Sequence, residues 1–465
     1  MMKKDHDIFL SIRGRVLVNV EALNMTESVG NYVKHRRVPV IMPGTYTTYF
    51  VPAISGESIA HGYQAVLAEE VENKNLPICN LCKKKIFLKS TNMDTITSGF
   101  LSKEKEISDW LEIKKEEWDN MVNIKNKKEK EKKERLQIFE QQIIPHKLES
   151  SIIANCVVED VGGFLYAEQK FFKVFNIGGV KRTSNFYVGY MIPVKEALGD
   201  ALIEPQLHSR YALGTTFVKR EQRGQMLYYV ELSSAAYSFS FDLDSKFIGK
   251  TTFVLGEAGK QVTFKQGNDN RKERISVSLD AVSNFLLEML FGAKKTRFLP
   301  IVDWESIVIA LSDDVWTTPS PFTANYVENS LRKLEKTDEN TKLFVYINPA
   351  ILEDTSVYVK KKTEELLNSF YEALEDFKKR LVEKGDANIV DWQEFKKKKL
   401  EEFLDRKVNE LVESSDLKYV SKIQKKYENF IEMAKGKEDK VKIYYNFEEC
   451  VKEALKEGKS RVSKE

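Results

Sequence analysis

Two long segments in which apolar and other residues alternate constrain this chain most strongly. They run from Ile8 to Val20 and from Tyr228 to Leu243, far apart in the sequence. Alternation with a period of two, rich in β-branched and aromatic residues, is typical of strands with one face in a core. We therefore expect both segments to be core strands, the second one as a single strand or a hairpin.

Other segments predict a mixture of strands and helices around these two. Thr45 to Ile54 and Phe298 to Leu311 have strand patterns, whereas Ile275 to Phe291 has a largely helical apolar pattern. Ser55 is a good N-cap for a helix that follows it. We expect a polar loop from Glu21 to Arg37 and strand-like, turn-rich sequence from Ile152 onward. Short strands at Leu343–Asn348 and Val441–Asn446, and a closing helix at Phe447–Leu455, are predicted near the end.

Two highly charged segments interrupt this α+β pattern. Residues 125–135 read KNKKEKEKKER and contain no apolar residue, which is typical of a solvated helix or linker. A second segment carries an amphipathic stripe through Leu366, Phe370 and Leu374. The predicted organisation is 1–84 for the first part of the core, 85–150 and 351–440 for charged helical insertions, 151–350 for the core and thumb, and 441–465 for the closing strand and helix. Because surface connections change closure entropy only slowly with length, we expect a protein in which a short linker replaces Ser356–Lys440 to stay folded.

Composition limits the class of protein. Hydrophobic residues make up 42% of the 465 residues, so a sizeable core can be buried. The formal net charge is only +3, so any nucleic-acid footprint must be local. Four cysteines are too few for a disulfide framework. The polar start and the lack of a long apolar run predict a cytoplasmic protein with no membrane partner.

The densest polar cluster lies between the first two strand-like segments, where Lys and Arg can bind phosphates and Asn and Ser can bind sugar or phosphate oxygens. An ordinary surface loop with a basic turn explains the same residues equally well. The cluster consists of Asn24, Ser28, Gly30, Asn31, Lys34, His35, Arg36 and Arg37.

Four further blocks are candidates, each with a plainer alternative. Ser55-Gly56 can offer amides to a phosphate, although capping is favoured. The Lys181-Arg182-Thr183-Ser184 block can grip a backbone, although a solvated hairpin tip is slightly favoured. A strand would put Gln206, His208 and Arg210 on one face, either lining an RNA groove or simply exposed. Lys294, Lys295 and Arg297 can clamp a phosphate or complement a helix C-terminus.

Signals for metal or catalysis are weaker. Cys79 and Cys82 have zinc-knuckle spacing, but a structural zinc needs four ligands, and His61 and Cys156 are unproven partners. We therefore predict no metal and no other cofactor. The sequence contains no Walker loop, HExxH or GxSxG motif. A metal-independent ribonuclease needs a base and an acid close together, and His35 and His208 are the one pair to consider.

Several stretches together resemble a known family. IRGRVLVNVEALNMTESVGNYVKHRR, FVPAISGESIAHGYQ, VEDVGGFLYA, VKRTSNFYVGYMIP, QLHSRY, YYVELSSAAYSFSFDLD and KKTRFLP occur in that order. They resemble the DevR-type backbone subunit of type I-A archaeal CRISPR Cascade, one of the RAMP proteins. The resemblance covers Ile8–Lys84, Ser151–Pro349 and Val441–Leu455.

The resemblance implies a modified RRM or ferredoxin-like antiparallel sheet with a projecting thumb. It also implies copies that stack along one CRISPR RNA, with the target DNA strand and other Cascade subunits as further partners, and no cutting by this subunit. The blocks Asn24–Arg37, Ser55–His61, Lys181–Ser184 and Gln206–Arg210 match positions expected to face RNA. An RNP aromatic pattern is not evident, which favours backbone contacts over base stacking. A related RAMP endoribonuclease is the main alternative, while a transcription regulator lacks a helix-turn-helix pattern.

Overall fold

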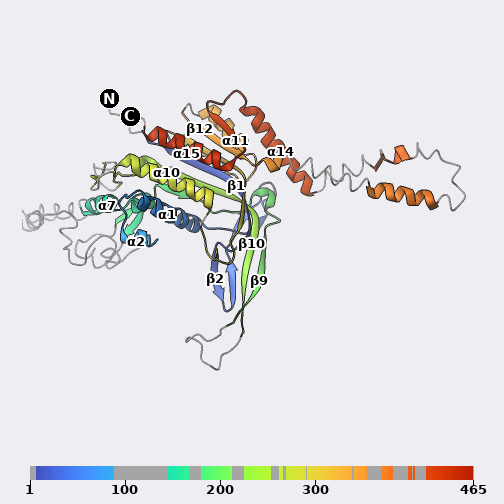
Figure 1. Cartoon of the computed structure of the whole chain (residues 1–465), viewed down its shortest axis with the longest axis horizontal. Helices are drawn as coiled ribbons and strands as arrows, with labels where there is room; N and C mark the ends of the chain where they lie inside the picture. The colour runs from blue at the N-terminus through green and yellow to red at the C-terminus, as the bar shows by residue number, and fades with distance from the viewer. Residues whose placement is uncertain are drawn as a thin grey trace, which may run out of the picture.

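The two long alternating segments pair with each other at the centre of a nine-stranded sheet (Figure 1). The structure, a computed structural model, describes residues 7–87, 144–166, 180–211, 225–252, 261–264, 269–289, 291–337, 340–352, 368–380, 396–400, 402–403 and 415–463. No helix among these residues is long and apolar enough to cross a membrane.

The main helices and strands follow in chain order: β1 (Phe9–Glu21), β2 (Met25–Val29), β3 (Tyr32–His35), β4 (Arg37–Ile41), β5 (Thr48–Pro52), α1 (Gly56–Asn73), α2 (Asn80–Lys83), α7 (Ile144–Asn155), α8 (Val157–Gly162), β6 (Phe164–Tyr166), β7 (Val180–Arg182), β8 (Phe186–Val188), β9 (Leu202–Tyr211), β10 (Gln225–Asp244), α10 (Arg271–Glu288), β11 (Ile301–Ser312), α11 (Tyr326–Thr337), β12 (Lys342–Ile347), α14 (Ser415–Ala434), β13 (Val441–Tyr444) and α15 (Phe447–Ser463).

The centre of the sheet has ferredoxin-like connectivity. Its strands lie in the order β11-β1-β10-β8, and each neighbouring pair is antiparallel. Helix α1 lies between β1 and β8 in the chain, and α10 lies between β10 and β11. This is the β-α-β-β-α-β arrangement, which confirms the predicted RRM or ferredoxin-like core. The full sheet is mixed, however, because β12–β13 and β3–β10 are parallel pairs.

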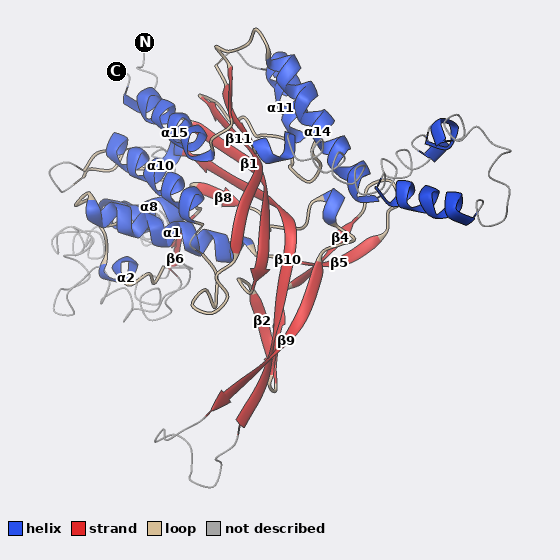
Figure 2. Ribbon diagram, turned by 45° about the vertical axis from the view of Figure 1, so that its right-hand side comes forward, coloured by secondary structure: helices blue, strands red, loops and turns tan. Residues whose placement is uncertain are grey.

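One face of the sheet is covered by α1, α10 and α15 (Figure 2). The ring of Tyr63 on α1 packs edge-on against Phe186 and Phe241 of the sheet, with ring centroids 4.7 and 5.0 Å apart. The Tyr63 hydroxyl donates to the carbonyl oxygen of Ser278 on α10. These contacts fix both crossover helices on the same face, as the ferredoxin-like connectivity requires.

The opposite face of the β11–β13 edge is covered by α11 and α14. Tyr427 and Phe430 of α14 are fully buried there, beside Val308 and Val345 of the sheet. The Tyr427 hydroxyl donates to Glu305, whose carboxylate also pairs with the buried Arg15 of β1 at 2.6 Å. Helix α14 lies inside the expected insertion 351–440 and packs on the edge of the core, so we no longer expect the fold to tolerate replacement of Ser356–Lys440.

Two local predictions differ from the structure. The expected loop from Glu21 to Arg37 contains the β2–β3 hairpin, which continues the sheet through β3. The predicted strand-like sequence from Ile152 begins instead with the end of α7 and with α8, and the strands β6, β7 and β8 come only after them. Ile152 and Ile153 of α7 and Val157 and Val161 of α8 are fully buried, and a short buried apolar run is typical of a strand and of a helix alike.

β10 extends far beyond the compact part of the sheet. Its 20 residues span roughly 65 Å at about 3.3 Å per residue. One half pairs with β1, and the other half pairs with β9 and β3. In Figure 1, β2, β9 and the first half of β10 form a projection from the body of the molecule. We call this part, residues 25–35, 202–211 and 225–234, the projection.

The packing of α14 generates a first prediction. Phe430→Ala should lower the free energy of unfolding by about 3–5 kcal/mol, because it removes a large side chain from a filled core. Urea unfolding followed by circular dichroism would measure the loss. The matched control is Phe377→Ala, since Phe377 is 46% exposed and its removal should change stability by less than about 0.5 kcal/mol.

Deletion variants extend this test to the whole charged segment. Replacing residues 356–414 with a Gly/Ser linker should keep the melting transition, because α14 remains on the sheet. Replacing residues 356–440 should abolish the melting transition or strongly lower its temperature, because this deletion also removes Tyr427 and Phe430 of α14. An unaltered transition in the longer deletion would show that α14 does not stabilise the core.

Candidate nucleic-acid interface

The first candidate block is organised around the side chain of Asn24. Its amide oxygen accepts a hydrogen bond from the Arg36 guanidinium at 2.7 Å and from the Ser55 backbone N–H at 3.0 Å. Arg36 also donates to the Tyr190 hydroxyl at 3.4 Å. The hairpin, the turn before α1 and the segment after β8 therefore meet at one place, although they lie far apart in the chain.

Ser55 serves mainly as a helix cap. Its hydroxyl oxygen accepts from the Ser58 N–H at 3.3 Å, and the residue is 2% exposed. Gly56 lies against the β8 strand, because a Cβ there would sit 3.1 Å from the Val188 carbonyl oxygen. This supports the capping interpretation of the turn and leaves Ser55 unable to reach a phosphate.

His35 is not on the surface. A bulge in the β1–β10 pairing follows Val18, and the buried Glu21 beyond it meets the His35 ring. The Nε2 atom of His35 lies 2.5 Å from the Glu21 carboxylate, and Nδ1 lies 2.9 Å from the Arg36 carbonyl oxygen. Both partners are acceptors, so the ring is held as an imidazolium that donates twice. His35 must be removed from the candidate RNA contacts.

The same geometry bears on the ribonuclease alternative. Both ring nitrogens of His35 are occupied inside the protein, and His35 is 2% exposed. A general base must reach the proton that it abstracts. The pair His35 and His208 therefore does not form an accessible acid–base site.

A second cluster combines two blocks that the sequence suggested separately. The His208 ring on β9 stacks on Tyr228 of β10 with centroids 5.4 Å apart, and its edge contacts Phe298 at 5.3 Å. The exposed Arg297 donates to the Tyr228 hydroxyl at 2.9 Å. The β9 strand and the basic turn after α10 thus form one surface of mixed basic and aromatic character.

Positive charge in this turn is crowded. Burial is the main cause that lowers the pKa of Lys294, and the charge of Arg297 lowers it further. The pKa of Lys295 is lowered by burial and then by the charge of Lys85. Lys294 also adopts a left-handed backbone with φ of +54°, just after Gly292. An anion bound here would relieve the repulsion among these cations, so the turn is suited to a phosphate.

Arg182 is the second predicted contact that lies in the interior. Its side chain is fully buried and pairs with Glu149 at 2.9 Å and Asp160 at 2.6 Å. Ser184 donates to the Gly162 carbonyl oxygen at 2.6 Å, which ties the turn to α8. Arg182 therefore belongs to a structural ion network, while Lys181 and Thr183 beside it stay exposed.

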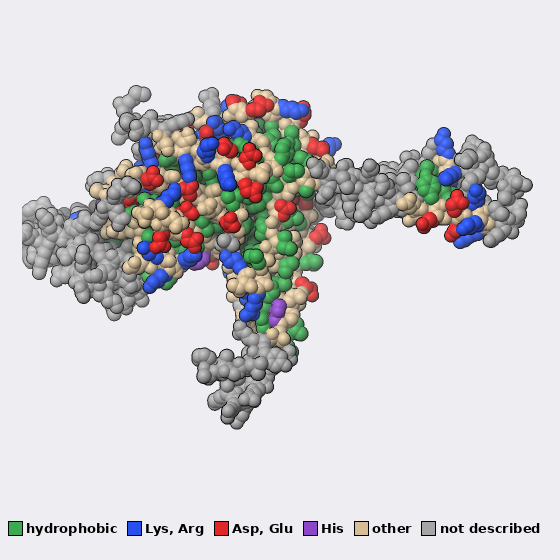
Figure 3. Space-filling view, viewed as in Figure 1, with side chains coloured by type: hydrophobic (Ala, Val, Ile, Leu, Met, Phe, Trp, Pro, Cys, Tyr) green, Lys and Arg blue, Asp and Glu red, His purple; other side chains and the backbone are tan. Residues whose placement is uncertain are grey.

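The remaining predicted residues divide by exposure. Those with exposed side chains are Ser28, Asn31, Lys34, Arg37, His61, Lys181, Thr183, Gln206 and Arg297. Those of intermediate exposure are Asn24, Arg36, Ser184, His208, Lys294 and Lys295. Arg210 lies within β9, but its side chain is outside the described part. Figure 3 shows basic, apolar and histidine side chains exposed together on the projection.

Sequence reasoning missed the aromatic members of this surface. Tyr228, Phe298 and Tyr190 contact the predicted residues, and Tyr229 is 40% exposed and stacks on Tyr32 with centroids 5.6 Å apart. The Tyr228-Tyr229 pair at the start of β10 is the signal that could have found them, because neighbouring residues of a strand point to opposite faces. One tyrosine of the pair must therefore face away from the core.

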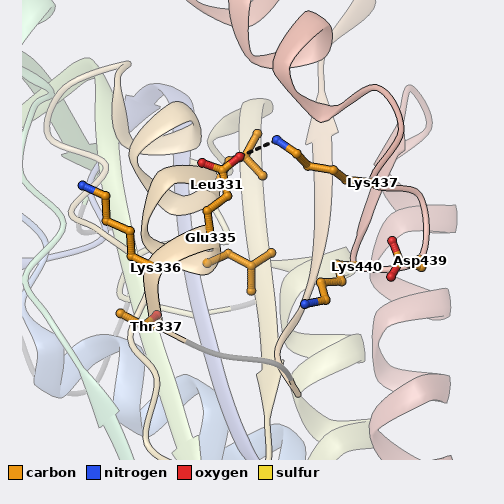
Figure 4. Close-up of a pocket in the computed structure, with 8 residues that line it drawn as sticks. Leu331, Glu335, Lys336, Thr337, Lys437, Asp439 and Lys440 are labelled. Carbon is orange, nitrogen blue, oxygen red and sulfur yellow. Dashed lines mark hydrogen bonds and ion pairs between the residues drawn. The ribbon is translucent and has the colours of Figure 1, made fainter.

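A hollow lined by residues of α11 is distinct from these clusters. It has a volume of about 740 Å³ and lies between α11 and the loop before β13 (Figure 4). Glu335 and Lys437 form an ion pair across it. None of the predicted site residues lines it, so we do not include it in the interface.

Comparison with known proteins gives a consistent family. A family model described as "CRISPR-associated negative auto-regulator DevR/Csa2" matches residues 12–331. The chain is 33% identical over 323 residues to "CRISPR-associated protein Cas7/Csa2 1" of Saccharolobus solfataricus, covering 69% of the chain and 84% of that protein. It is 30% identical over 330 residues to "CRISPR-associated aCascade subunit Cas7/Csa2 2" of the same organism, covering 69% and 85%.

Solved structures overlap more loosely. A chain of a "CRISPR RNA-guided surveillance complex, pre-nicking" has a TM-score of 0.35 and 10% identity, covering 73% of this chain and 91% of that one. Family membership therefore rests on the sequence matches.

The buried His35–Glu21 pair generates a prediction on pH. Burial lowers the pKa of His35, but the hydrogen bond and charge of Glu21 outweigh it, so the pKa is raised above 6.5. A raised folded-state pKa adds stability that is fully present below about pH 6.5 and is lost as the pH rises through the folded value. The melting temperature of the wild type should therefore fall as the pH rises from about 6.5 through the folded-state pKa of His35.

His35→Gln should flatten that fall and lower stability by about 3–5 kcal/mol, because Glu21 loses its buried partner. Thermal melts at several pH values would measure both effects. His146→Gln on α7 is the control and should leave the pH profile in place. A profile that is equally steep in His35→Gln would contradict the assignment.

Proposed function

Because the chain belongs to the DevR/Csa2 family of CRISPR-associated proteins, we propose that it binds CRISPR RNA as a backbone subunit of a type I-A-like Cascade. At the coarser level it is a Cas7-type CRISPR Cascade subunit. In the finer proposal, copies of the chain stack along the guide RNA and support its pairing with a target DNA strand.

The observation that carries the RNA-binding proposal is the cluster of His208, Tyr228 and Arg297. It joins a strand of the projection to a crowded basic turn, and the Tyr228 hydroxyl, under the stacked His208 ring, accepts a hydrogen bond from Arg297. Arginine and lysine near a projecting strand suit the phosphates of a single strand. Contacts to the backbone leave the bases of a guide free to pair with a target.

The Asn24–Arg37 hairpin supplies a second surface for the same strand. Ser28, Asn31 and Lys34 are exposed on it, and Arg37 is half-exposed while it pairs with Glu231 at 3.1 Å. The Arg36 side chain is held by Asn24, which orients its guanidinium before any ligand binds. Such preorganisation reduces the entropy lost on binding.

Contacts with other subunits have a separate candidate surface. The β4–β5 hairpin exposes Ile41, Tyr46 and Phe50 at 59, 81 and 73%. Exposed apolar side chains in one hairpin are typical of protein–protein contacts. We propose that this hairpin contacts a neighbouring copy or another Cascade subunit.

RNA binding is testable at the basic turn. Lys294→Ala with Arg297→Ala should weaken binding of single-stranded RNA to a similar degree for different sequences, because phosphates are common to all of them. The slope of log K against log salt should become shallower by about one for each phosphate that the variant no longer binds. Fluorescence anisotropy at several salt concentrations would measure both.

The matched control is Lys452→Ala with Lys456→Ala on the exposed face of α15, which removes the same charge. It should leave affinity and slope nearly unchanged. If both double variants lose the same affinity, the loss comes from overall charge, and the turn is no specific RNA contact.

Absence of cleavage is a separate prediction. The full chain incubated with single-stranded RNA, with or without divalent metal, should leave the RNA intact on a denaturing gel, because the histidine pair offers no accessible acid and base. Cleavage that is lost in His208→Ala would support the endoribonuclease alternative instead.

A further inference from the structure

Three cysteines from two distant parts of the chain meet in the interior. Cys79 precedes α2, Cys82 lies within α2, and Cys156 precedes α8. Their Sγ atoms all lie within 4.8 Å of one another, and the residues are 4, 0 and 0% exposed. All three are free thiols in this structure. His61, the other partner that the sequence suggested, packs instead against Phe87 with centroids 5.1 Å apart.

Three sulfurs within 4.8 Å of one another are close enough to bind one metal ion together. Zn–S bonds of about 2.3 Å at tetrahedral angles place two sulfurs about 3.8 Å apart. The Cys82 backbone N–H donates to Cys79 Sγ at 3.4 Å, within the four-residue turn Cys79–Cys82. A hydrogen bond to sulfur favours the thiolate, which is the form that binds metal.

A fourth donor is present beside the cysteines. The Glu159 carboxylate lies 3.1 Å from Cys82 Sγ, through its Oε1 atom, and Glu159 is fully buried. Cys156 is the N-cap residue of α8, and Glu159 lies in the first turn of that helix, so both belong to the same helix start. Carboxylate oxygens bind zinc at about 2.0–2.2 Å, so Glu159, which contacts Cys82, is the residue that can supply a fourth ligand to the three sulfurs.

We propose that the chain binds one structural zinc ion through Cys79, Cys82, Cys156 and Glu159. The thiolates select a soft or borderline metal over magnesium or calcium, and burial without an open position favours a structural role over a catalytic one. The site is independent of the RNA-binding proposal, because its residues lie in the apolar core rather than on the interface.

Its place in the fold suggests what the ion stabilises. Cys79 and Cys82 precede the charged segment 85–150, and Cys156 follows it. One direct hydrogen bond already joins the two sides, from the Val157 N–H to the Pro77 carbonyl oxygen at 2.9 Å. A zinc ion there would link the residues before the segment to the residues after it. Changes of length or sequence within the segment would then leave the packing of α1 and α8 unaltered.

Metal content of the full chain is the direct test. Protein purified without chelator should contain about one zinc per chain by mass spectrometry, and metal-free reduced protein should bind added Co²⁺ with an intense thiolate-to-cobalt absorption band. Cys156→Ser and Cys82→Ser should lose the band and weaken Zn²⁺ binding by more than the roughly 10–100-fold typical of changes around a metal site. Glu159→Gln should keep the thiolate band but weaken Zn²⁺ binding.

Cys450→Ser is the matched control, because Cys450 is a buried cysteine on α15 outside the group of three. It should bind Zn²⁺ and Co²⁺ like the wild type. A chelator should lower the melting temperature of the wild type and of Cys450→Ser, but not that of Cys156→Ser. The wild-type measurements decide the proposal even if a cysteine variant does not fold.

Two results would overturn the proposal. One is wild-type protein that contains no zinc and, when reduced, gives no cobalt band at a stoichiometric concentration. The other is a disulfide between two of the three cysteines in protein purified under reducing conditions, found by peptide mapping.

Discussion

The carboxylate of Asp160 holds together more of the chain than any other polar group described above. One oxygen accepts from Arg182 at 2.6 Å, the other accepts from Arg274 at 2.9 Å, and the Gly249 N–H donates to both. All three charged side chains are fully buried. Removing one partner of such a group leaves a buried charge uncompensated, at a cost of about 3–5 kcal/mol. Helix α8, strand β7 and helix α10 therefore depend on one another.

This network gives a structural role to two of the sequence blocks that resemble the family. VEDVGGFLYA contains Asp160, and VKRTSNFYVGYMIP contains Arg182 and Asn185, whose amide donates to the Asp160 carbonyl oxygen at 2.8 Å. These blocks accordingly keep the helical layer aligned on the sheet. A basic motif beside hydroxyl residues resembles a phosphate site in sequence, but here its charge is neutralised inside the protein.

The central strands and their crossover helices could be predicted because each carries its own periodic pattern. β1, β10, α10 and β11 form close to the predicted places, and Ser55 caps α1. Whether a single polar side chain is buried or exposed could not be predicted in the same way. His35 is buried by Glu21, which lies beyond a bulge, and Arg182 is buried by Glu149 and Asp160. Cys156 joins the Cys79–Cys82 pair across a long segment. These positions depend on partners from distant segments, which local spacing does not encode.

β10 has a mechanical consequence. The strand that pairs with β1 in the body continues without interruption into the projection, where it pairs with β9. At its body end Asp242 is fixed by the paired guanidinium of Arg13, with contacts of 2.7 and 2.9 Å. A strand without a hinge behaves as a lever, so the orientation of the projection is set by the body. In the proposed stack of copies along a guide RNA, the rise and rotation from one copy to the next would follow from the twist of this strand, and a change of curvature would need the sheet itself to deform.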